Sequence, residues 1–349
     1  MVYIVRTERL TRVYESRIYR NYVGIDKDTT FFYELYKRLT GRKLVTVALR
    51  DVSIKIEKGE FVCILGPNGS GKTTLLKVLA TLLPPTSGTA EVMGYDVVKE
   101  RKEVVKRVNY ITSVLAAGAW AQAKLSVRKN LEFMAKLLSL SPARVLETAS
   151  QLGLNEVLDM PFGALSTGQQ ARVGLALGLS KDVPVYLLDE PTLGLSPEAS
   201  KAVREILKDL NRRKGITILY ATQHPLYVQE MASKVVILRK GQVIVEGEPK
   251  TLIKNSGIKE SIEMAVYNVN SNIRSILEKL DPDYINIKPL NERIGEYIVR
   301  IGVRDSDEVL PKLVWELVSR NIKIRKLRVK RASLEDAYLY YIGGRHEQA

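Results

Sequence analysis

The chain has 349 residues, 45% of them hydrophobic, which suffices for two domains or for one large domain with an appendage. Its formal net charge of +15 predicts an acidic partner, either nucleic acid or the anionic face of a membrane. No apolar run approaches the ~20 residues that cross a bilayer, and the first residues do not resemble a signal peptide, so we expect a cytosolic chain. The single cysteine, Cys63, excludes a disulfide framework, and no structural metal is expected.

The first part of the chain predicts a strand over residues 2–14, followed by a basic and aromatic insertion over about residues 15–43. Two interpretations of this insertion stay open. It is either a patch that binds nucleic acid or a membrane surface, or a helical segment whose aromatic rings pack on the body of the protein. Residues 45–56 then alternate like a half-buried strand, and residues 58–60 form a turn into the next strand.

That next strand leads into a phosphate-binding loop motif. The pattern G-x-x-x-x-G-K-[ST] is filled by Gly66, Pro67, Asn68, Gly69, Ser70, Gly71, Lys72 and Thr73. Residues 61–65 precede it as an apolar strand, and a helix that begins at Thr74 follows it. This order surrounds one anion with backbone N–H groups and the positive end of a helix. We expect Lys72 to reach the β- and γ-phosphates of a nucleoside triphosphate, Thr73 to hold Mg²⁺, and Thr74 to lie beside the phosphates.

The middle of the chain is mostly helical between about residues 95 and 165, which we interpret as a helical lobe inserted into the nucleotide-binding core. Ser166 then caps an apolar helix. Alternating strands and helices follow, over residues 185–188, 197–214, 216–221 and 235–238. Such alternation predicts an α/β fold with a mainly parallel sheet and helices on both faces.

Two carboxylates, Asp189 and Glu190, stand at the end of a predicted buried strand, where ligands approach open α/β sheets. Adjacent residues on a strand point to opposite faces, so the two have different roles. Asp189 suits Mg²⁺, and Glu190 suits polarisation of the water that attacks the γ-phosphate. His224, beyond the next strand, is a candidate hydrogen-bond donor to that phosphate. A structural salt bridge and a structural histidine are the alternatives.

The composition changes beyond residue 256. Residues 257–349 predict helices and strands without a phosphate loop or catalytic cluster, and we expect a separate small α+β domain after an ATPase domain over residues 1–256. No second phosphate loop occurs in the sequence, so one ATP-binding core is expected.

Together these motifs resemble the nucleotide-binding subunit of ABC transporters, over roughly residues 44–248. Residues 66–73 look like its Walker A motif, residues 185–190 like Walker B with the catalytic glutamate, and His224 like its switch histidine. Residues 165–169 match its LSGGQ signature with Thr167 in place of the first glycine. The resemblance implies a P-loop NTPase (RecA-like) core that binds ATP and Mg²⁺.

The family works as a head-to-tail dimer, in which each ATP lies between Walker A of one subunit and the signature of the other. By this resemblance Ser166, Gly168 and Gln169 would contact the nucleotide bound to a second ATPase subunit, in a homo- or heterodimer. Thr167 is expected to be tolerated, because Gly168 retains the close backbone approach.

Two positions, Gln122 and Ser196, depart from the family pattern, and a third, Tyr14, is the candidate for contact with adenine. Gln122 is the candidate for the Q-loop glutamine, although it lies unusually close to Leu125. Ser196 stands where the D-loop aspartate is expected, so communication between the two ATP sites is altered. Tyr14 is the candidate for stacking on adenine, with the insertion directly after it.

Residues 332–339 resemble the tail of ATPases that serve ABC-2-type exporters. We therefore expect a peripheral protein on the cytoplasmic face of the membrane, which powers export through an integral membrane permease subunit. The alternative is a soluble ABC ATPase that acts on nucleic acid or a translation complex, favoured by the charge of +15 but opposed by the single ATPase core. Nucleic acid is thus an unlikely partner. A transport ATPase for import is a third option.

Overall fold

The computed structural model describes residues 3–15, 45–113, 118–269, 272–291 and 295–343. The chain forms two compact units. The first comprises residues 1–223 and 238–243, and the second comprises residues 224–237 and 244–349. None of the helices in the described ranges has the length and apolar composition that a bilayer crossing requires.

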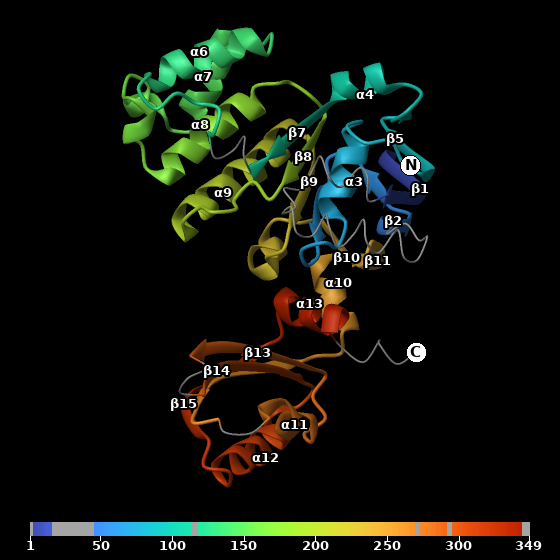
Figure 1. The fold of residues 1–349 in the computed structure, drawn as a ribbon, viewed down its shortest axis with the longest axis vertical. Helices are drawn as coiled ribbons and strands as arrows, with labels where there is room; N and C mark the ends of the chain where they lie inside the picture. The colour runs from blue at the N-terminus through green and yellow to red at the C-terminus, as the bar shows by residue number, and fades with distance from the viewer. Residues whose placement is uncertain (1–2, 16–44, 114–117, 270–271, 292–294, 344–349) are drawn as a thin grey trace, which may run out of the picture. The chain divides into compact units, whose positions relative to one another are not determined.

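A parallel sheet lies at the centre of the first unit (Figure 1). Its strands β4 (Phe61–Leu65), β9 (Thr217–Thr222), β8 (Val185–Asp189) and β7 (Val108–Thr112) are neighbours in that order. Every residue of β4, β8 and β9 is buried, as expected of strands covered on both faces. The sequence prediction missed β7, which interrupts the expected helical lobe and extends this sheet instead.

A second, antiparallel sheet belongs to the same unit. It consists of β1 (Tyr3–Glu15), β2 (Val45–Val52), β3 (Lys55–Glu57), β5 (Ser87–Val92) and β6 (Tyr95–Asp96). The long strand β1 is its centre, because it pairs with β2, β3 and β5. The predicted insertion over residues 15–43 lies almost entirely outside the described residues.

The helices of the first unit begin with capping side chains where the sequence provides them. They are α3 (Lys72–Leu79), α4 (Arg101–Arg107), α6 (Val127–Leu137), α7 (Pro142–Gln151), α8 (Thr167–Leu179) and α9 (Pro197–Lys214). Ser196 caps the start of α9, and Gly215 ends it in the left-handed conformation with φ 62°. The helices α6, α7 and α8 pack on one another (Figure 1). The helices α6 and α7 fall within the predicted helical region of residues 95–165, whereas α8 follows it.

The second unit begins with a short 3₁₀ helix, η3 (Pro225–Glu230), which directly follows His224. The strands β10 (Lys234–Arg239) and β11 (Gln242–Gly247) are divided between the units, because the turn that joins them belongs to the first. The helix α10 (Pro249–Asn255) follows. The compact units thus divide the chain differently from the predicted domain boundary after residue 256, which remains a prediction.

The C-terminal part of the second unit is a four-stranded antiparallel sheet in the order β13-β14-β12-β15. Its elements in chain order are β12 (Glu260–Tyr267), α11 (Ile273–Glu278), β13 (Tyr284–Asn291), β14 (Glu296–Val303), α12 (Ser306–Val318), β15 (Lys323–Arg331) and α13 (Leu334–Gly343). The helices α11 and α12 cover one face of the sheet, and α13 lies on the other (Figure 1). Side chains such as Met264, Ile301 and Leu313 form a core between sheet and helices.

Candidate functional site

The loop over residues 66–71 turns sharply from β4 into α3. Gly69 and Gly71 have φ angles of 77° and 105°, in the region that favours glycine. At Gly66 and Gly71 an added Cβ would lie 2.4 Å from Leu238 O and 2.5 Å from Ala48 O. These glycines are therefore required by close backbone packing as well as by turn geometry.

Backbone atoms of distant segments hold this loop in place. The Gly241 N–H donates to Ser70 O at 3.1 Å, and the Arg50 N–H donates to Gly241 O at 2.8 Å. Lys240 and Gly241 both have positive φ angles, as a tight hairpin turn requires. The loop is thus supported by main-chain contacts. Among the residues that make them, Gly241 must remain glycine, because a Cβ there would lie 2.8 Å from Ala48 O.

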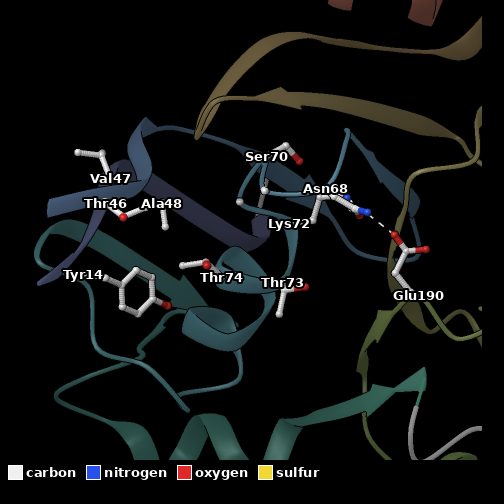
Figure 2. Close-up of a pocket in the computed structure, with 12 residues that line it drawn as sticks. Tyr14, Thr46, Val47, Ala48, Asn68, Ser70, Lys72, Thr73, Thr74 and Glu190 are labelled. Atoms are coloured by element: carbon white, nitrogen blue, oxygen red, sulfur yellow. Dashed lines mark ion pairs between the residues drawn. The ribbon is translucent and has the colours of Figure 1, made fainter. Parts of the chain in front are cut away.

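The ammonium group of Lys72 points back over the loop. Its Nζ donates to Gly66 O at 2.8 Å and to Pro67 O at 3.1 Å. It also lies 3.8 Å from Glu190 Oε1, an ion pair drawn in Figure 2. Burial lowers the pKa of Lys72, while the charges of Glu190 and Asp189 oppose that shift. An anionic phosphate beside Nζ would favour the charged form further.

Asp189 is the last residue of β8 and is buried. Its two carboxylate oxygens accept hydrogen bonds from different partners: Thr73 Oγ1 donates to Oδ1 at 3.0 Å, and Tyr110 Oη donates to Oδ2 at 2.8 Å. Burial, and then the charge of Asp189, raises the pKa of Tyr110, so its hydroxyl stays protonated and donates. Tyr110 was not predicted as a site residue. The feature that could have identified it is a polar aromatic residue just upstream of the expected Q-loop position.

Glu190 leaves the strand with a φ angle of 48°, which is rare for a residue that is not glycine. Its N–H donates to Ala221 O at 3.1 Å, and its side chain is only 17% exposed. Both carboxylates reach residues of the phosphate loop, because the strand ends at Asp189 and the backbone turns at Glu190. Asp189 and Glu190 therefore do not face opposite sides as neighbours within one strand would, although the two contact different partners.

A cavity of about 260 Å³ opens beside the loop (Figure 2). It is lined by Tyr14, Thr46, Val47, Ala48, Asn68, Gly69, Ser70, Gly71, Lys72, Thr73, Thr74 and Glu190. Tyr14 forms one side of it, and the guanidinium of Arg12 lies 4.9 Å from its ring centroid. The wall from β2, residues 46–48, was not predicted, because an alternating strand carries no motif that marks a ligand site.

The residues around the cavity fit a triphosphate with a divalent cation. Ser70 Oγ is buried and has no hydrogen-bond partner among the described residues, and a Cβ at Gly69 would meet no atom within 4 Å. The Ser70 hydroxyl can therefore donate to a phosphate oxygen, and Gly69 leaves space for one. Thr73 and Asp189 together supply the oxygen ligands that Mg²⁺ prefers.

The residues of the predicted signature lie at the start of α8 and do not line this cavity. Ser166 caps the helix, as predicted: Ser166 Oγ accepts from the Gln169 N–H at 3.3 Å, and Gln169 Oε1 accepts from the Ser166 N–H at 2.9 Å. A Cβ at Gly168 would lie 2.8 Å from Ala199 Cβ, so this glycine also permits close packing of α8 on α9.

Two further predicted residues do not line the cavity either. Gln122 is exposed in the segment before α6, where its N–H donates to Asn130 Oδ1 at 2.8 Å. His224 is exposed and belongs to the second unit, directly before η3. The nucleotide roles of Gln122, Ser166, Gly168, Gln169 and His224 remain predictions.

Comparison with known proteins agrees with this site. The family model described as ABC transporter matches residues 49–193, which include the phosphate loop and both carboxylates. The ATP-binding protein NatA of Bacillus subtilis is 34% identical over 224 residues, covering 63% of this chain and 89% of NatA. This chain belongs to the ABC transporter ATP-binding proteins.

Other members of this family align with more of the chain. The doxorubicin resistance ATP-binding protein DrrA of Mycobacterium tuberculosis is 29% identical over 310 residues, covering 86% of this chain and 90% of DrrA. The methionine import ATP-binding protein MetN of Streptococcus pyogenes is 29% identical over 285 residues, covering 78% of this chain and 79% of MetN.

Among solved structures, cbiO1 of Clostridium perfringens, part of the ABC transporter complex cbiONQ, superimposes with a TM-score of 0.57. It is 26% identical, and the match covers 73% of this chain and 92% of cbiO1. The predicted P-loop ATPase fold is thereby confirmed. The chain is an ATP-binding subunit of ABC transporters and hydrolyses ATP.

Proposed function

We propose that this chain hydrolyses Mg-ATP in a head-to-tail dimer and powers export through a separate membrane permease, on the cytoplasmic face of the membrane. The observation that carries the proposal is the arrangement around Lys72. Its ammonium group lies beside Glu190, and the neighbouring Thr73 shares Asp189 with Tyr110.

Each residue then has a distinct part in hydrolysis. Lys72 and the loop N–H groups hold the phosphates, and Glu190 orients and deprotonates the attacking water. Thr73 and Asp189 would hold Mg²⁺, which neutralises charge on the phosphate oxygens. The positive φ angle of Glu190 directs its side chain toward the loop rather than along the strand.

The dimer is supported by what the cavity lacks within one chain. It is lined on one side by the phosphate loop and Tyr14, while Ser166 and Gly168 at the start of α8 are at least partly exposed and contribute nothing to it. A second subunit in head-to-tail orientation would bring these residues to the γ-phosphate and exclude water.

Export is supported by the similarity to DrrA, a doxorubicin resistance ATP-binding protein that aligns over 86% of this chain. MetN, an import protein, aligns over a smaller share. The proposal of export therefore rests on the larger share of the chain that aligns with DrrA than with MetN, and on the similarity of residues 332–339 to exporter ATPases.

A capture experiment tests the proposal. Glu190→Gln protein held with ATP serves as bait in detergent-solubilised native membranes, with nuclease controls. We expect a multi-span membrane protein that raises the ATP turnover of wild-type protein when both are reconstituted in liposomes. Recovery of nuclease-sensitive RNA or ribosomal proteins, without a membrane partner, would overturn the transporter proposal and favour action on nucleic acid.

A further inference from the structure

His224 lies at the junction of the two units. The strand β9 of the first unit ends at Thr222, and the second unit begins at His224. The 3₁₀ helix η3 starts at the next residue, and its Pro225 and Val228 are buried. Within the second unit, the position of the His224 backbone therefore depends on η3.

The helix η3 is in turn held by α13. Leu334, the first residue of α13, is 1% exposed, and its N–H donates to Gln229 Oε1 at 3.1 Å. The first N–H groups of a helix have no partner within the helix, so Gln229 satisfies one of them. The two helices also pack against each other, and α13 contacts α10, where Tyr341 Oη donates to Leu252 O at 3.1 Å.

The start of α13 is fixed to the C-terminal sheet by Asp336, which is fully buried. This carboxylate accepts from the Ser333 N–H at 2.7 Å and from Tyr284 Oη of β13 at 2.6 Å. Arg300 Nε of β14 lies 3.4 Å from it. Burial, and then the charge of Asp336, raises the pKa of Tyr284, so its hydroxyl remains a donor.

These contacts form a continuous path from the C-terminal sheet to the segment that carries His224. We propose that Gln229 is a positioning residue for His224, and that the C-terminal sheet controls ATP turnover through Asp336, Leu334 and Gln229. This inference rests on the proposed function and on the predicted hydrogen bond from His224 to the γ-phosphate. It gives the C-terminal domain a role in hydrolysis although it contains no nucleotide-binding motif.

The test uses three variants of the full chain. Gln229→Ala removes the acceptor for the Leu334 N–H, Gln229→Glu retains an oxygen at the same position, and Glu230→Ala is the matched control on the same exposed turn. We expect Gln229→Ala to lower kcat about fivefold, which corresponds to the free energy of one hydrogen bond. The KM for ATP should change less than about twofold. Gln229→Glu restores kcat, and Glu230→Ala leaves it unchanged.

A double-mutant cycle separates this inference from the proposed role of His224. If His224→Ala leaves kcat at the wild-type value, the γ-phosphate contact is wrong and the inference fails with it. If His224→Ala lowers kcat, we expect Gln229→Ala to cause no further loss in that background. A further loss of the same size would show that Gln229 acts elsewhere and would overturn the inference alone.

Amide hydrogen exchange and thermal unfolding distinguish loss of the contact between Gln229 and Leu334 from destabilisation of the whole protein. We expect faster exchange of the Leu334 amide in Gln229→Ala, with an unfolding temperature within a few degrees of wild type. Wild-type kcat in Gln229→Ala, despite faster exchange at Leu334, would overturn the proposed control of turnover.

Discussion

The hydroxyl of Tyr110 donates a hydrogen bond of 2.8 Å to Asp189 Oδ2, the carboxylate oxygen that does not accept from Thr73. The contact joins the middle of β7 to the carboxyl end of β8, its parallel neighbour. A carboxylate with one oxygen fixed in this way presents the other toward the phosphate loop. Partners of metal-binding groups tune metal affinity in the same manner.

Replacement of Tyr110 by phenylalanine is therefore expected to weaken Mg²⁺ binding while the phosphate loop remains intact. We expect Tyr110→Phe to raise the Mg²⁺ concentration for half-maximal ATPase activity about tenfold. The measurement is a Mg²⁺ titration at fixed ATP. Tyr186→Phe is the control, since Tyr186 is also buried but donates to the main-chain oxygens of Leu179 and Lys181. An equal Mg²⁺ dependence in both variants would contradict the role of Tyr110.

Glu190→Gln removes the charge that faces Lys72 and the carboxylate that we propose as the base for the attacking water. We expect ATP hydrolysis to fall at least about 10²-fold, as for loss of a general base, while ATP still binds. Phosphate release and equilibrium binding of a fluorescent ATP analogue measure the two effects. Glu198→Gln, on the exposed first turn of α9, is the control. Wild-type turnover in Glu190→Gln would remove Glu190 from the mechanism.

Ser166→Arg tests the role of the signature in the second subunit. We expect normal ATP binding but no ATP-dependent dimer in light scattering, because a long cation would occupy the space for the partner's nucleotide. Ser141→Arg is a matched control: Ser141 also caps an exposed helix start, that of α7. Both variants lose about 1 kcal/mol of capping energy. Persistent dimers of Ser166→Arg would contradict the trans contact.

Cys63 offers a reporter of the ATPase core. It lies fully buried in β4, directly before the phosphate loop, and burial raises the pKa of its thiol. Since the thiolate is the reactive form, we expect no labelling by a maleimide in the native protein and labelling only upon opening of the core. Saturating Mg-ATP should slow labelling further by mass action, about 100-fold at 100 times Kd. Rapid labelling of the native protein would contradict the buried position.

The sequence predicted the phosphate loop and its carboxylates because each depends on local chemistry. The loop over residues 66–73 requires glycines, a lysine and a hydroxyl at fixed spacing, and the buried strand before Asp189 is continuously apolar. The helix start at Ser166 was predictable for the same reason, since a capping side chain satisfies groups within three residues.

Features that depend on contacts between distant segments were not predicted. The strand β7 follows α4 without a turn residue, and it is recognisable only through its pairing with β8. The strand β12 mixes charged and apolar residues, yet it pairs with both β14 and β15. The grouping of His224 with the C-terminal unit likewise arises from packing of η3 on α13.

The main-chain contact between Gly241 and Ser70 makes the affinity for nucleotide depend on a turn that does not line the cavity. Because backbone groups already fix the loop, nucleotide binding requires little ordering of the chain, and the interaction energy is retained as affinity. Length changes in the turn around Lys240 would raise this entropic cost, and so would a side chain at Gly241, whose Cβ would lie 2.8 Å from Ala48 O. The nucleotide affinity of this chain is thus sensitive to insertions in a turn that does not line the cavity.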